Sequence, residues 1–393
     1  MGPEGSEVPA PWTSNFGTEA PFAIGVEEEL LLVGQDNRLA ESSVRARERA
    51  EPAVGDVDAE LYRAMVETRS DVCASAREAL IHLREVRREL CASGSRFMGV
   101  GIHPQAAAGE AEFDGARRYA EIQDTLQGIL RTPICGQHVH VGMPDAETAV
   151  RAYNGIRVHI PLLNALAANS PFWFDEDSGL ASARTVVFRS YPRAAMAPAF
   201  DDFEHFTRVT RQVCLAAGID DYTHIWWDAR IHPALGTIEV RAADTQFDLR
   251  RAAGLAALVH CLTRVEAERW QGDIPAREAL AESSFQATRH GLDAELLDGA
   301  GRRVPARELA WRALDTASEV AAELGCDEEM GYVAGILEEG TGADLQRRVH
   351  AEAGMEGLLS WLVEASTDVE DFDQAPGAVS SRREGRETSA QAR

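Results

Sequence analysis

The chain of 393 residues contains no lysine, so all 39 of its basic side chains are arginine. This absence excludes the nucleotide-binding P-loop, a lysine Schiff base and the strand lysine of protein kinases, because each of them needs a lysine ammonium group. Any phosphate bound here must be held by arginine, metal or backbone amides. Arginine suits that task, since its planar guanidinium group binds phosphate and carboxylate oxygens in a bidentate manner.

Cysteine is scarce, and no two of the six cysteines are separated by only two residues. This spacing excludes a zinc cluster of paired cysteines and a dense disulfide framework. Cys214 and Cys261 lie in apolar helical surroundings, so we expect both side chains in the hydrophobic core.

Long hydrophobic runs are also absent. The most apolar stretch, residues 252–262, is far shorter than the roughly 18 residues that a membrane span needs. The N-terminus has no basic region followed by an apolar run, which is the pattern of a secretory signal. The net charge of −25 repels the phosphates of nucleic acids and of anionic lipids. We therefore expect a cytoplasmic protein that binds neither nucleic acid nor membrane.

The two ends of the chain differ from its middle in composition. Residues 1–20 and 372–393 are rich in small and polar residues, and they predict a flexible lead-in and a disordered tail. Between them there is no long linker, low-complexity tract or repeat. The sequence thus predicts one folded domain over residues 21–371.

Strand-like and helical segments follow one another in an uneven order. Segments 22–33, 137–143 and 184–191 read as strands, and residues 223–244 read as two strands joined across a turn at 233–236. Segments 74–94 and 201–218 read as helices that end at glycine, and the chain from 249 to about 365 is almost entirely helical. Early strands and late helices predict an α+β fold with an antiparallel sheet and a helical C-terminal region.

Charged side chains recur at a spacing of two in four short segments. Strand side chains alternate in direction, so both members of each pair project from one face, while apolar neighbours such as Val139 and Val240 project from the other. The polar face is expected to line a cleft. The pairs are Glu27 and Glu29, Glu67 and Arg69, His138 and His140, and Glu239 and Arg241.

Each pair alone could be the solvated face of a half-exposed strand, since alternating charge is normal in antiparallel sheets. Together the pairs favour a site, because clustered carboxylates repel one another unless a cation lies among them. Hard oxygen ligands suit Mg²⁺ or Mn²⁺, which would bridge a polyphosphate beside Arg241. His138 and His140 could instead be a zinc pair, which would need a third ligand and an open position. The surplus of glutamates favours the hard metal.

Several distinctive segments occur in a fixed order and carry a family resemblance. They are GVEEELLLV (25–33), VETRSDVC (66–73), GQHVHVGMPD (136–145), LLNALAANSPFW (162–173), ASARTVVFRSYPR (181–193), WWDARIHPALGTIEVRAADTQ (226–246) and RHGLDAELLD (289–298). In these segments the chain resembles the glutamate–cysteine ligase type 2 family, the carboxylate–amine ligases of bacteria. The resemblance covers residues 21–365.

The resemblance implies a glutamine-synthetase-like fold, in which helices pack on the outer face of a curved antiparallel sheet and the active site lies in its concavity. It implies ATP as a substrate and Mg²⁺ or Mn²⁺ as cofactor. The implied ATP and metal ligands are Glu27, Glu29, Glu67, His138 and Glu239. Arg241, Arg230 and Arg184 would be catalytic and face phosphate or the substrate carboxylate. The candidate substrate-binding residues are His140, Arg69 and Asn169.

The implied reaction joins L-glutamate and L-cysteine, or a related acid and amine. The γ-carboxylate of glutamate takes the γ-phosphoryl group of ATP, and the amine then displaces phosphate to form an amide. Large aromatic residues such as Trp226 could wall this site, although packing in the core is their more usual role. A homodimer is the form of assembly that symmetry alone favours.

The chain departs from the family pattern in two places. Residues 283–289 read SSFQATR, where the family commonly has an amide and further basic and aromatic residues. Arg69 stands where a small or apolar residue is more usual. Four other functions stay open: ligation of another acid and amine, a guanidino-kinase-like phosphotransfer on the same fold, a His-x-His metal hydrolase, and a relative without activity.

Overall fold

The computed structural model describes residues 12–126, 128, 131–271 and 275–369. The expected tail at 372–393 and the first half of the expected lead-in lie outside these residues. Residues 12–20 pack against the fold: the ring of Trp12 lies 4.9 Å from that of Tyr222, and the Asn15 N–H donates to Pro233 O. The flexible lead-in predicted for residues 1–20 therefore does not include this part, because Trp12 gives it an apolar anchor.

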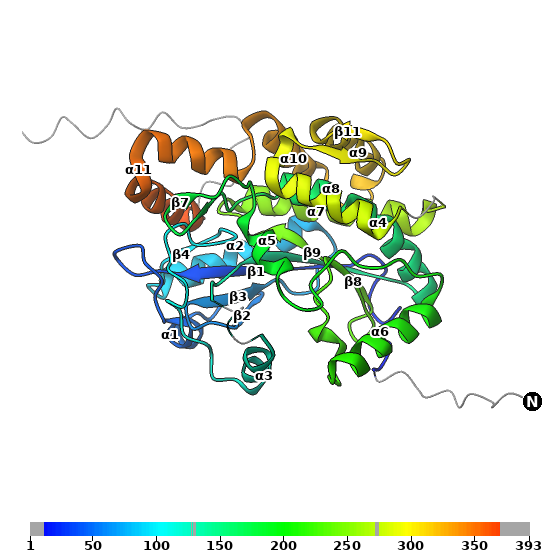
Figure 1. The fold of residues 1–393 in the computed structure, drawn as a ribbon, viewed down its shortest axis with the longest axis horizontal. Coiled ribbons are helices and arrows are strands. Elements are labelled where there is room, and N and C mark those ends of the chain that lie inside the picture. Colours follow the sequence, from blue (N-terminus) through cyan, green and yellow to red (C-terminus); the bar gives the residue numbers. More distant parts are fainter. Residues whose placement is uncertain (1–11, 127, 129–130, 272–274, 370–393) are drawn as a thin grey trace, which may run out of the picture.

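A seven-stranded antiparallel sheet runs through the middle of the molecule (Figure 1). Its strands pair in the order β2-β3-β1-β5-β9-β8, and β4 also pairs with β1. The strands are β1 (Ile24–Leu32), β2 (Asp56–Ala59), β3 (Met65–Arg69), β4 (Phe97–Met98), β5 (Gly136–Gly142), β8 (Ala229–His232) and β9 (Thr237–Asp244).

Three helices cover one face of this sheet: α2 (Ala76–Ala92), α4 (Ala146–Leu166) and α7 (Leu249–Arg269). They bury the apolar side chains that alternate along the strands, such as Val26, Val139 and Val240. A second layer packs on α4 and α7, so α7 is buried on nearly all sides, as its apolar sequence requires. This layer holds α8 (Arg277–His290), α9 (Ala306–Ala321) and α10 (Asp327–Glu339).

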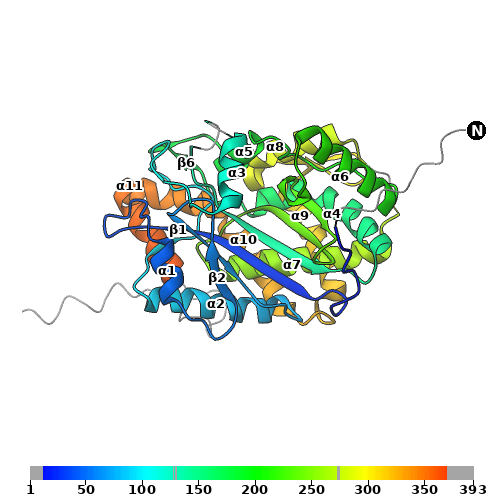
Figure 2. The same cartoon turned by 90° about the horizontal axis from the view of Figure 1, so that it is seen from below.

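The opposite face of the sheet is flanked by shorter elements (Figure 2). In the view of Figure 1, α3 (Arg117–Leu126) lies below the sheet, on the side away from α7 and α10.

The remaining elements of the described chain lie around these layers. They are α1 (Ser43–Arg49), α5 (Ala183–Arg189), α6 (Phe203–Ala217), α11 (Gly342–Thr367), the turns η2 (Tyr222–His224) and η3 (Gly291–Asp293), and the hairpins β6–β7 (Phe172–Trp173 and Glu176–Asp177) and β10–β11 (Glu295–Leu297 and Arg303–Pro305).

The predicted α+β class and most predicted elements are confirmed. The helix predicted over 201–218 is α6, and Gly218 ends it in the left-handed conformation with φ of 66°. Cys214 and Cys261 are buried as expected.

One predicted strand is wrong. Most of residues 184–191 belongs to α5, which ends at Arg189, because the Ser182 hydroxyl caps the helix by accepting from Thr185 N–H, which outweighs the strand preference of two adjacent valines. The first of the two strands predicted in 223–244 is shorter than expected, since η2 and an irregular segment precede β8.

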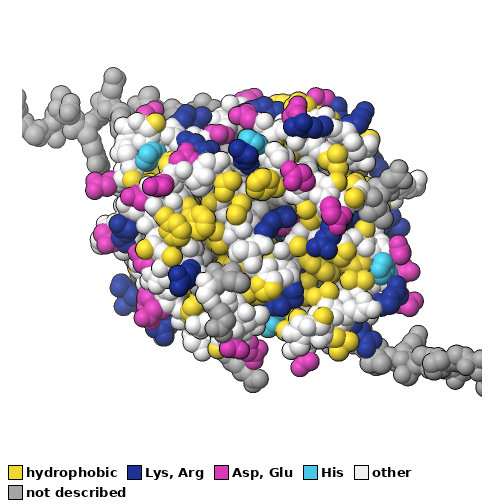
Figure 3. All heavy atoms as spheres, viewed as in Figure 1, with side chains coloured by type: hydrophobic (Ala, Val, Ile, Leu, Met, Phe, Trp, Pro, Cys, Tyr) yellow, Lys and Arg dark blue, Asp and Glu magenta, His cyan; other side chains and the backbone are white. Residues whose placement is uncertain are grey.

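The surface mixes both signs of charge. On the face drawn in Figure 3, acidic and arginine side chains are interspersed, with hydrophobic side chains gathered between them. Among the described residues, no helix is long and apolar enough to cross a membrane.

Candidate active site

The four charged pairs lie side by side on one face of the sheet. Strand pairing places Glu29 opposite Glu67, and Glu27 opposite both Arg69 and His138. The next pair of strands places His140 opposite Glu239. The common face predicted from the spacing of two is therefore confirmed, and the central strands β1, β5 and β9 carry most of its charge.

A cleft of about 450 Å³ opens on this face. Strand residues with charged side chains form its floor, and a second wall of different chemistry faces them. The floor includes Glu27, Glu29, Glu67, His138, Arg230 and Arg241, with Arg184 of α5 beside them. The second wall includes Glu60, Leu61, Tyr62, Tyr119, Ile122, Phe188, Tyr191 and Trp226.

Glu239 lies between two arginines at the edge of the floor. Its carboxylate accepts hydrogen bonds from Arg230 Nε and from an Nη of Arg241. Burial alone would raise the pKa of Glu239, but the two guanidinium groups and the nearby histidines hold it well below the usual value. Glu239 therefore stays ionised and fixes the direction of both arginines.

Arg184 reaches the same floor from α5. Its Nη1 donates to the carbonyl oxygen of Arg241 at 3.2 Å, and its guanidinium carbon lies 5.0 Å from the centre of the Phe188 ring. A Cβ atom on Gly136 would lie 2.2 Å from Nη2 of Arg184, so only glycine at the start of β5 leaves room for this side chain. The Nε atoms of Arg184 and Arg241 are buried without a hydrogen-bond partner among the described residues. Both can therefore donate to a ligand oxygen.

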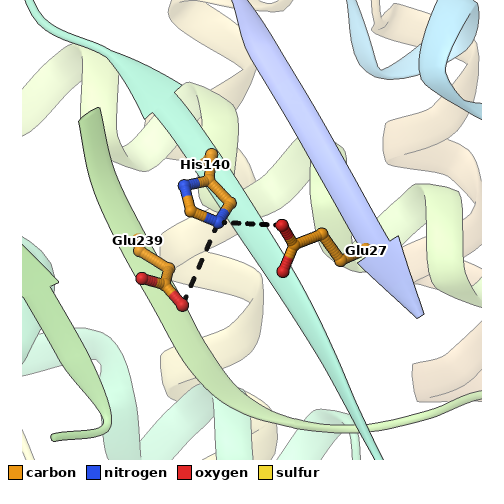
Figure 4. Close-up of side chains that lie close together, drawn as sticks. All are labelled: Glu27, His140 and Glu239. Carbon is orange, nitrogen blue, oxygen red and sulfur yellow. Dashed lines mark ion pairs between the residues drawn. The ribbon is translucent and has the colours of Figure 1, made fainter. Parts of the chain in front are cut away.

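Two overlapping sets of side chains have the composition of a divalent-cation site. One set is Glu27, His140 and Glu239, and the other is Glu27, Glu67 and His138; in each, the ligand atoms lie within 4.8 Å of one another. Figure 4 shows the first set, where His140 Nε2 lies 3.5 Å from Glu27 Oε1 and 3.9 Å from Glu239 Oε1. The Nε2 atoms of both histidines are buried and make no hydrogen bond within the described residues. These donors fit a hard cation such as Mg²⁺ or Mn²⁺.

Electrostatics point the same way. Burial, Glu27, Glu60 and Glu29 together raise the pKa of Glu67 well above its usual value. Burial also acts to raise the pKa of Glu27, but His140 and His138 hold it well below the usual value. Burial lowers the pKa of His140, and Glu27 and Glu239 outweigh it, so the net shift is upward. The carboxylates thus draw positive charge toward the floor.

Not every predicted site residue lies at the cleft. Asn169 is fully buried outside it, where its amide donates to Gly99 O and Thr245 O and joins two segments of the core. Arg69 lines the cleft, but Asp56 and Asp58 lie 2.7 and 2.9 Å from its Nη2. His140, a predicted substrate-binding residue, lies among the cation donors. Glu29, a predicted cation ligand, is in neither donor set, and its carboxylate accepts a hydrogen bond from the Gly136 N–H.

The segment that departs from the family pattern, residues 283–289, belongs to α8. Ser284 Oγ donates to Asn164 and accepts from Arg189, and no residue of the segment lines the cleft. Its changes therefore act on the packing of α8 against α4 and α5. Trp226 lines the cleft, whereas Trp227 and Phe172 belong to the core.

The sequence prediction missed the second wall. Glu60 lies between β2 and β3, and burial and the charge of Glu29 raise its pKa to about 8. Tyr62 and Tyr191 are almost fully buried, yet they line the cleft. These residues lie outside the regular strands, so the strand alternation that revealed the floor could not place them on a common face.

Comparisons with known proteins now bear on this site. The family model of glutamate–cysteine ligase family 2 matches residues 23–365. A protein of Rubrobacter xylanophilus named "Putative glutamate–cysteine ligase 2-3" is 40% identical over 363 residues, which are 90% of this chain and 99% of that one. The glutamate–cysteine ligase of Haloferax volcanii is 35% identical over 351 residues, 86% of this chain and 95% of that one.

Solved structures show the same fold at low sequence identity. The glutamate–cysteine ligase of Francisella tularensis, solved with AMP, has a TM-score of 0.66 at 11% identity and covers 90% of both chains. A bifunctional glutathione synthetase of Pasteurella multocida has a TM-score of 0.63 at 12% identity, over 88% of this chain and 52% of that one. The fold expected from the resemblance is confirmed. The chain belongs to glutamate–cysteine ligase family 2 and is an ATP-dependent ligase.

Proposed function

We propose that this protein joins the γ-carboxylate of L-glutamate to the amino group of L-cysteine, with ATP as the source of energy. The observation that carries the proposal is the arrangement around Glu239: two arginines fixed on one carboxylate, beside two sets of cation donors, at the floor of one cleft. The family and the named relatives support the choice of substrates. The AMP bound by the Francisella tularensis enzyme supports a nucleotide in this fold.

The first step is the attack of one carboxylate oxygen of glutamate on the γ-phosphorus of ATP. A new P–O bond forms while the bond from the γ-phosphorus to the bridging oxygen breaks, and ADP leaves. Both reactants are anions, so their repulsion must be screened. Arg241 and Arg184 would do so, and the proposal is supported by the buried Nε–H of each, which has no partner among the described residues and can bind a phosphate or carboxylate oxygen.

A divalent cation would be held by Glu27 with Glu67 and His138, or by Glu27 with His140 and Glu239. When bound, it would neutralise phosphate charge during the transfer. Glu239 and Arg230 are hydrogen-bonded to each other and hold the arginine side of the floor in place.

In the second step the amino nitrogen of cysteine attacks the acyl carbon of the γ-glutamyl phosphate. The ammonium nitrogen first loses a proton to become a neutral amine. The C–N bond then forms, the C–O bond to phosphate breaks, and the nitrogen gives up a second proton, with water and the released phosphate as the proton acceptors. Water would compete with the amine in an open site. Tyr191, Phe188 and Trp226 line the cleft and leave less room for water around the acyl group.

The proposal is tested by following ADP, phosphate and amide in purified protein with Mg²⁺ and ATP. We expect ADP and phosphate in equal amounts, only when glutamate and cysteine are both present, together with γ-glutamylcysteine by mass spectrometry. Turnover with a different acid or amine would show that the proposed substrates are wrong but that the protein is still a ligase. ATP turnover that needs no amine would contradict the proposal.

A further inference from the structure

The second wall of the cleft differs from the floor in both charge and polarity. Its apolar part is contributed by residues of the cluster that includes Ile122, Phe188 and Trp226. Within this wall, Glu60 supplies a carboxyl group, and Tyr62, Tyr119 and Tyr191 supply phenol groups. No arginine whose side chain the structure describes forms an ion pair with the Glu60 carboxyl group; Arg241 acts on it only at longer range, in contrast to its contact with Glu239 on the floor.

Glu60 is held in a defined position. Its Oε2 lies 3.3 Å from the hydroxyl of Tyr119, and that hydroxyl also donates to the carbonyl oxygen of Ala59 at 2.7 Å. The neighbouring charge of Glu29 and burial both disfavour a further negative group here. An anionic ligand would therefore avoid this wall, whereas a cationic one would be attracted to it and would favour the ionised form of Glu60.

Two phenol groups provide an independent sign that a ligand binds beside Glu60. Tyr62 is 2% exposed and Tyr191 is 8% exposed, and the hydroxyls of both are buried without a hydrogen-bond partner among the described residues. Both side chains line the cleft. Because a buried hydroxyl without a partner costs free energy, this position favours a ligand that carries polar atoms next to an apolar part.

The reaction brings three reacting groups to the cleft: the polyphosphate, the carboxylate of the acid and the amine. The first two are anions and belong with the arginines of the floor. The amine arrives as an ammonium ion and matches the opposite wall. Building on the proposed function, we propose that Glu60 binds the ammonium group of the acceptor amine, and that the wall of Tyr62, Tyr191, Phe188 and Trp226 receives its uncharged substituent.

This assignment defines a class of acceptor. A primary amine with a compact apolar or weakly polar side chain fits the wall, and cysteine, with its –CH2SH side chain, belongs to this class. An amine with an acidic substituent, such as aspartate, would bring a second negative charge toward Glu60 and Glu29. We therefore expect the enzyme to prefer apolar acceptors to acidic ones of similar size.

Hydroxylamine separates the role of Glu60 from the first chemical step. It is uncharged at neutral pH, so it can trap an acyl phosphate as the hydroxamate without an ammonium site. Wild-type protein with Mg²⁺, ATP and glutamate should form hydroxamate with hydroxylamine and amide with cysteine. In Glu60→Gln, we expect the KM for cysteine to rise about tenfold or more, because an ionic hydrogen bond to the amine is lost. Hydroxamate formation should persist in this variant.

Two further variants control the interpretation. Glu112→Gln changes an exposed carboxylate that pairs with Arg63, and it should leave the KM for cysteine at the wild-type value. Tyr191→Phe removes only one phenol oxygen and should raise the KM for cysteine by less than Glu60→Gln does. Melting temperatures of all the variants show whether each one is folded.

The outcomes are distinct. An unchanged KM for cysteine in folded Glu60→Gln would overturn the inference and leave the proposed ligase standing. A rise in the KM for ATP, with the KM for cysteine unchanged, would overturn it in favour of nucleotide binding at this wall. If wild-type protein forms neither hydroxamate nor amide, the proposed function fails and the inference fails with it.

Discussion

Two neighbouring glutamates of β1 have opposite surroundings. Glu28 points to the helical side of the sheet, is fully buried, and pairs with Arg87 of α2 through two hydrogen bonds of 2.8 and 3.1 Å. Arg87 also donates to the carbonyl oxygens of Gln246 and Phe247, so its donors are largely satisfied. Glu27, one residue earlier, faces the cleft among other carboxylates and two histidines. The charges of Glu28 and Arg87 are balanced by each other within the chain. The carboxylates around Glu27 still lack positive charge.

This contrast separates a structural ion pair from a binding site. Burial raises the pKa of Glu28 in spite of Arg87, so desolvation exceeds the attraction between the two charges. Such a pair contributes mainly by being costly to break. The cleft carboxylates instead outnumber the cations that face them, and they gain stability when positive charge arrives.

The largest effect is expected from breaking the complete pair. Glu28→Gln leaves the Arg87 guanidinium buried without its counter-charge, and should reduce the free energy of unfolding by about 3–5 kcal/mol. Urea unfolding followed by circular dichroism measures the loss. Replacing both partners, as in Glu28→Gln with Arg87→Met, should recover part of the stability. If the single variant were as stable as wild type, the two glutamates would not differ in the way described.

Next in size is the loss of the arginine fork on the floor. Arg241→Lys keeps the charge but loses the planar guanidinium group, whose Nη binds Glu239 while its Nε–H is left for a ligand oxygen, so kcat should fall by about a hundredfold or more. The assay is the release of ADP with saturating substrates. Arg63→Lys, at an exposed pair with Glu112, is the matched control and should leave kcat at the wild-type value. Near-normal turnover of Arg241→Lys would show that Arg241 does not bind the phosphate during the reaction.

Divalent cations should stabilise the cleft side of β1. At a concentration about 100 times the dissociation constant, Mg²⁺ or Mn²⁺ should add about 2.7 kcal/mol to the free energy of unfolding. Glu27→Gln, which affects both donor sets, should lose most of this gain. Without metal it should be less stable than wild type at neutral pH, because it loses the attraction to His138 and His140 that lowers the pKa of Glu27. Thermal unfolding with and without chelator measures both effects. A cation response that survives in Glu27→Gln would place the ion elsewhere.

The smallest effect concerns pH. Glu60 has a pKa of about 8 in the folded protein, above its unfolded value, so unfolding releases its proton between about pH 4.5 and pH 8. Its contribution to stability is present below this window and is lost as the pH rises through it. In metal-free protein, Glu60→Gln should reduce the fall in stability from pH 5 to pH 8 by about 1–2 kcal/mol. Equal slopes for the two proteins would show that Glu60 is ionised throughout.

The floor of the cleft could be predicted from the sequence because strand geometry is local. A spacing of two fixes the face of both members of a pair, and Glu27, His138 and Glu239 meet once the strands align. The second wall could not be predicted, because Glu60 and Tyr191 come from irregular segments that only tertiary structure brings together. Asn169 shows the converse, since a polar residue in a distinctive motif serves the core.

The fold could be predicted for a similar reason, and the errors of that prediction are confined to single elements. Helices with a clear apolar face and a capping residue, such as α2 and α6, appear where they were expected. In α5 the two valines favour a strand, but the cap at Ser182 and burial against neighbouring elements select a helix. That choice matters for the site, since it is the helix that directs Arg184 across Gly136.

The use of arginine alone on the floor of the cleft has a chemical consequence. An acyl phosphate is a strong acylating agent, and a neutral lysine amine beside it would compete with the incoming acceptor for the activated carbon. Arg184, Arg230 and Arg241 offer only guanidinium groups, which stay protonated and are poor nucleophiles. For the reaction proposed, a lysine-free chain cannot acylate itself on a side-chain amine, so this one route of self-inactivation by its own intermediate is closed.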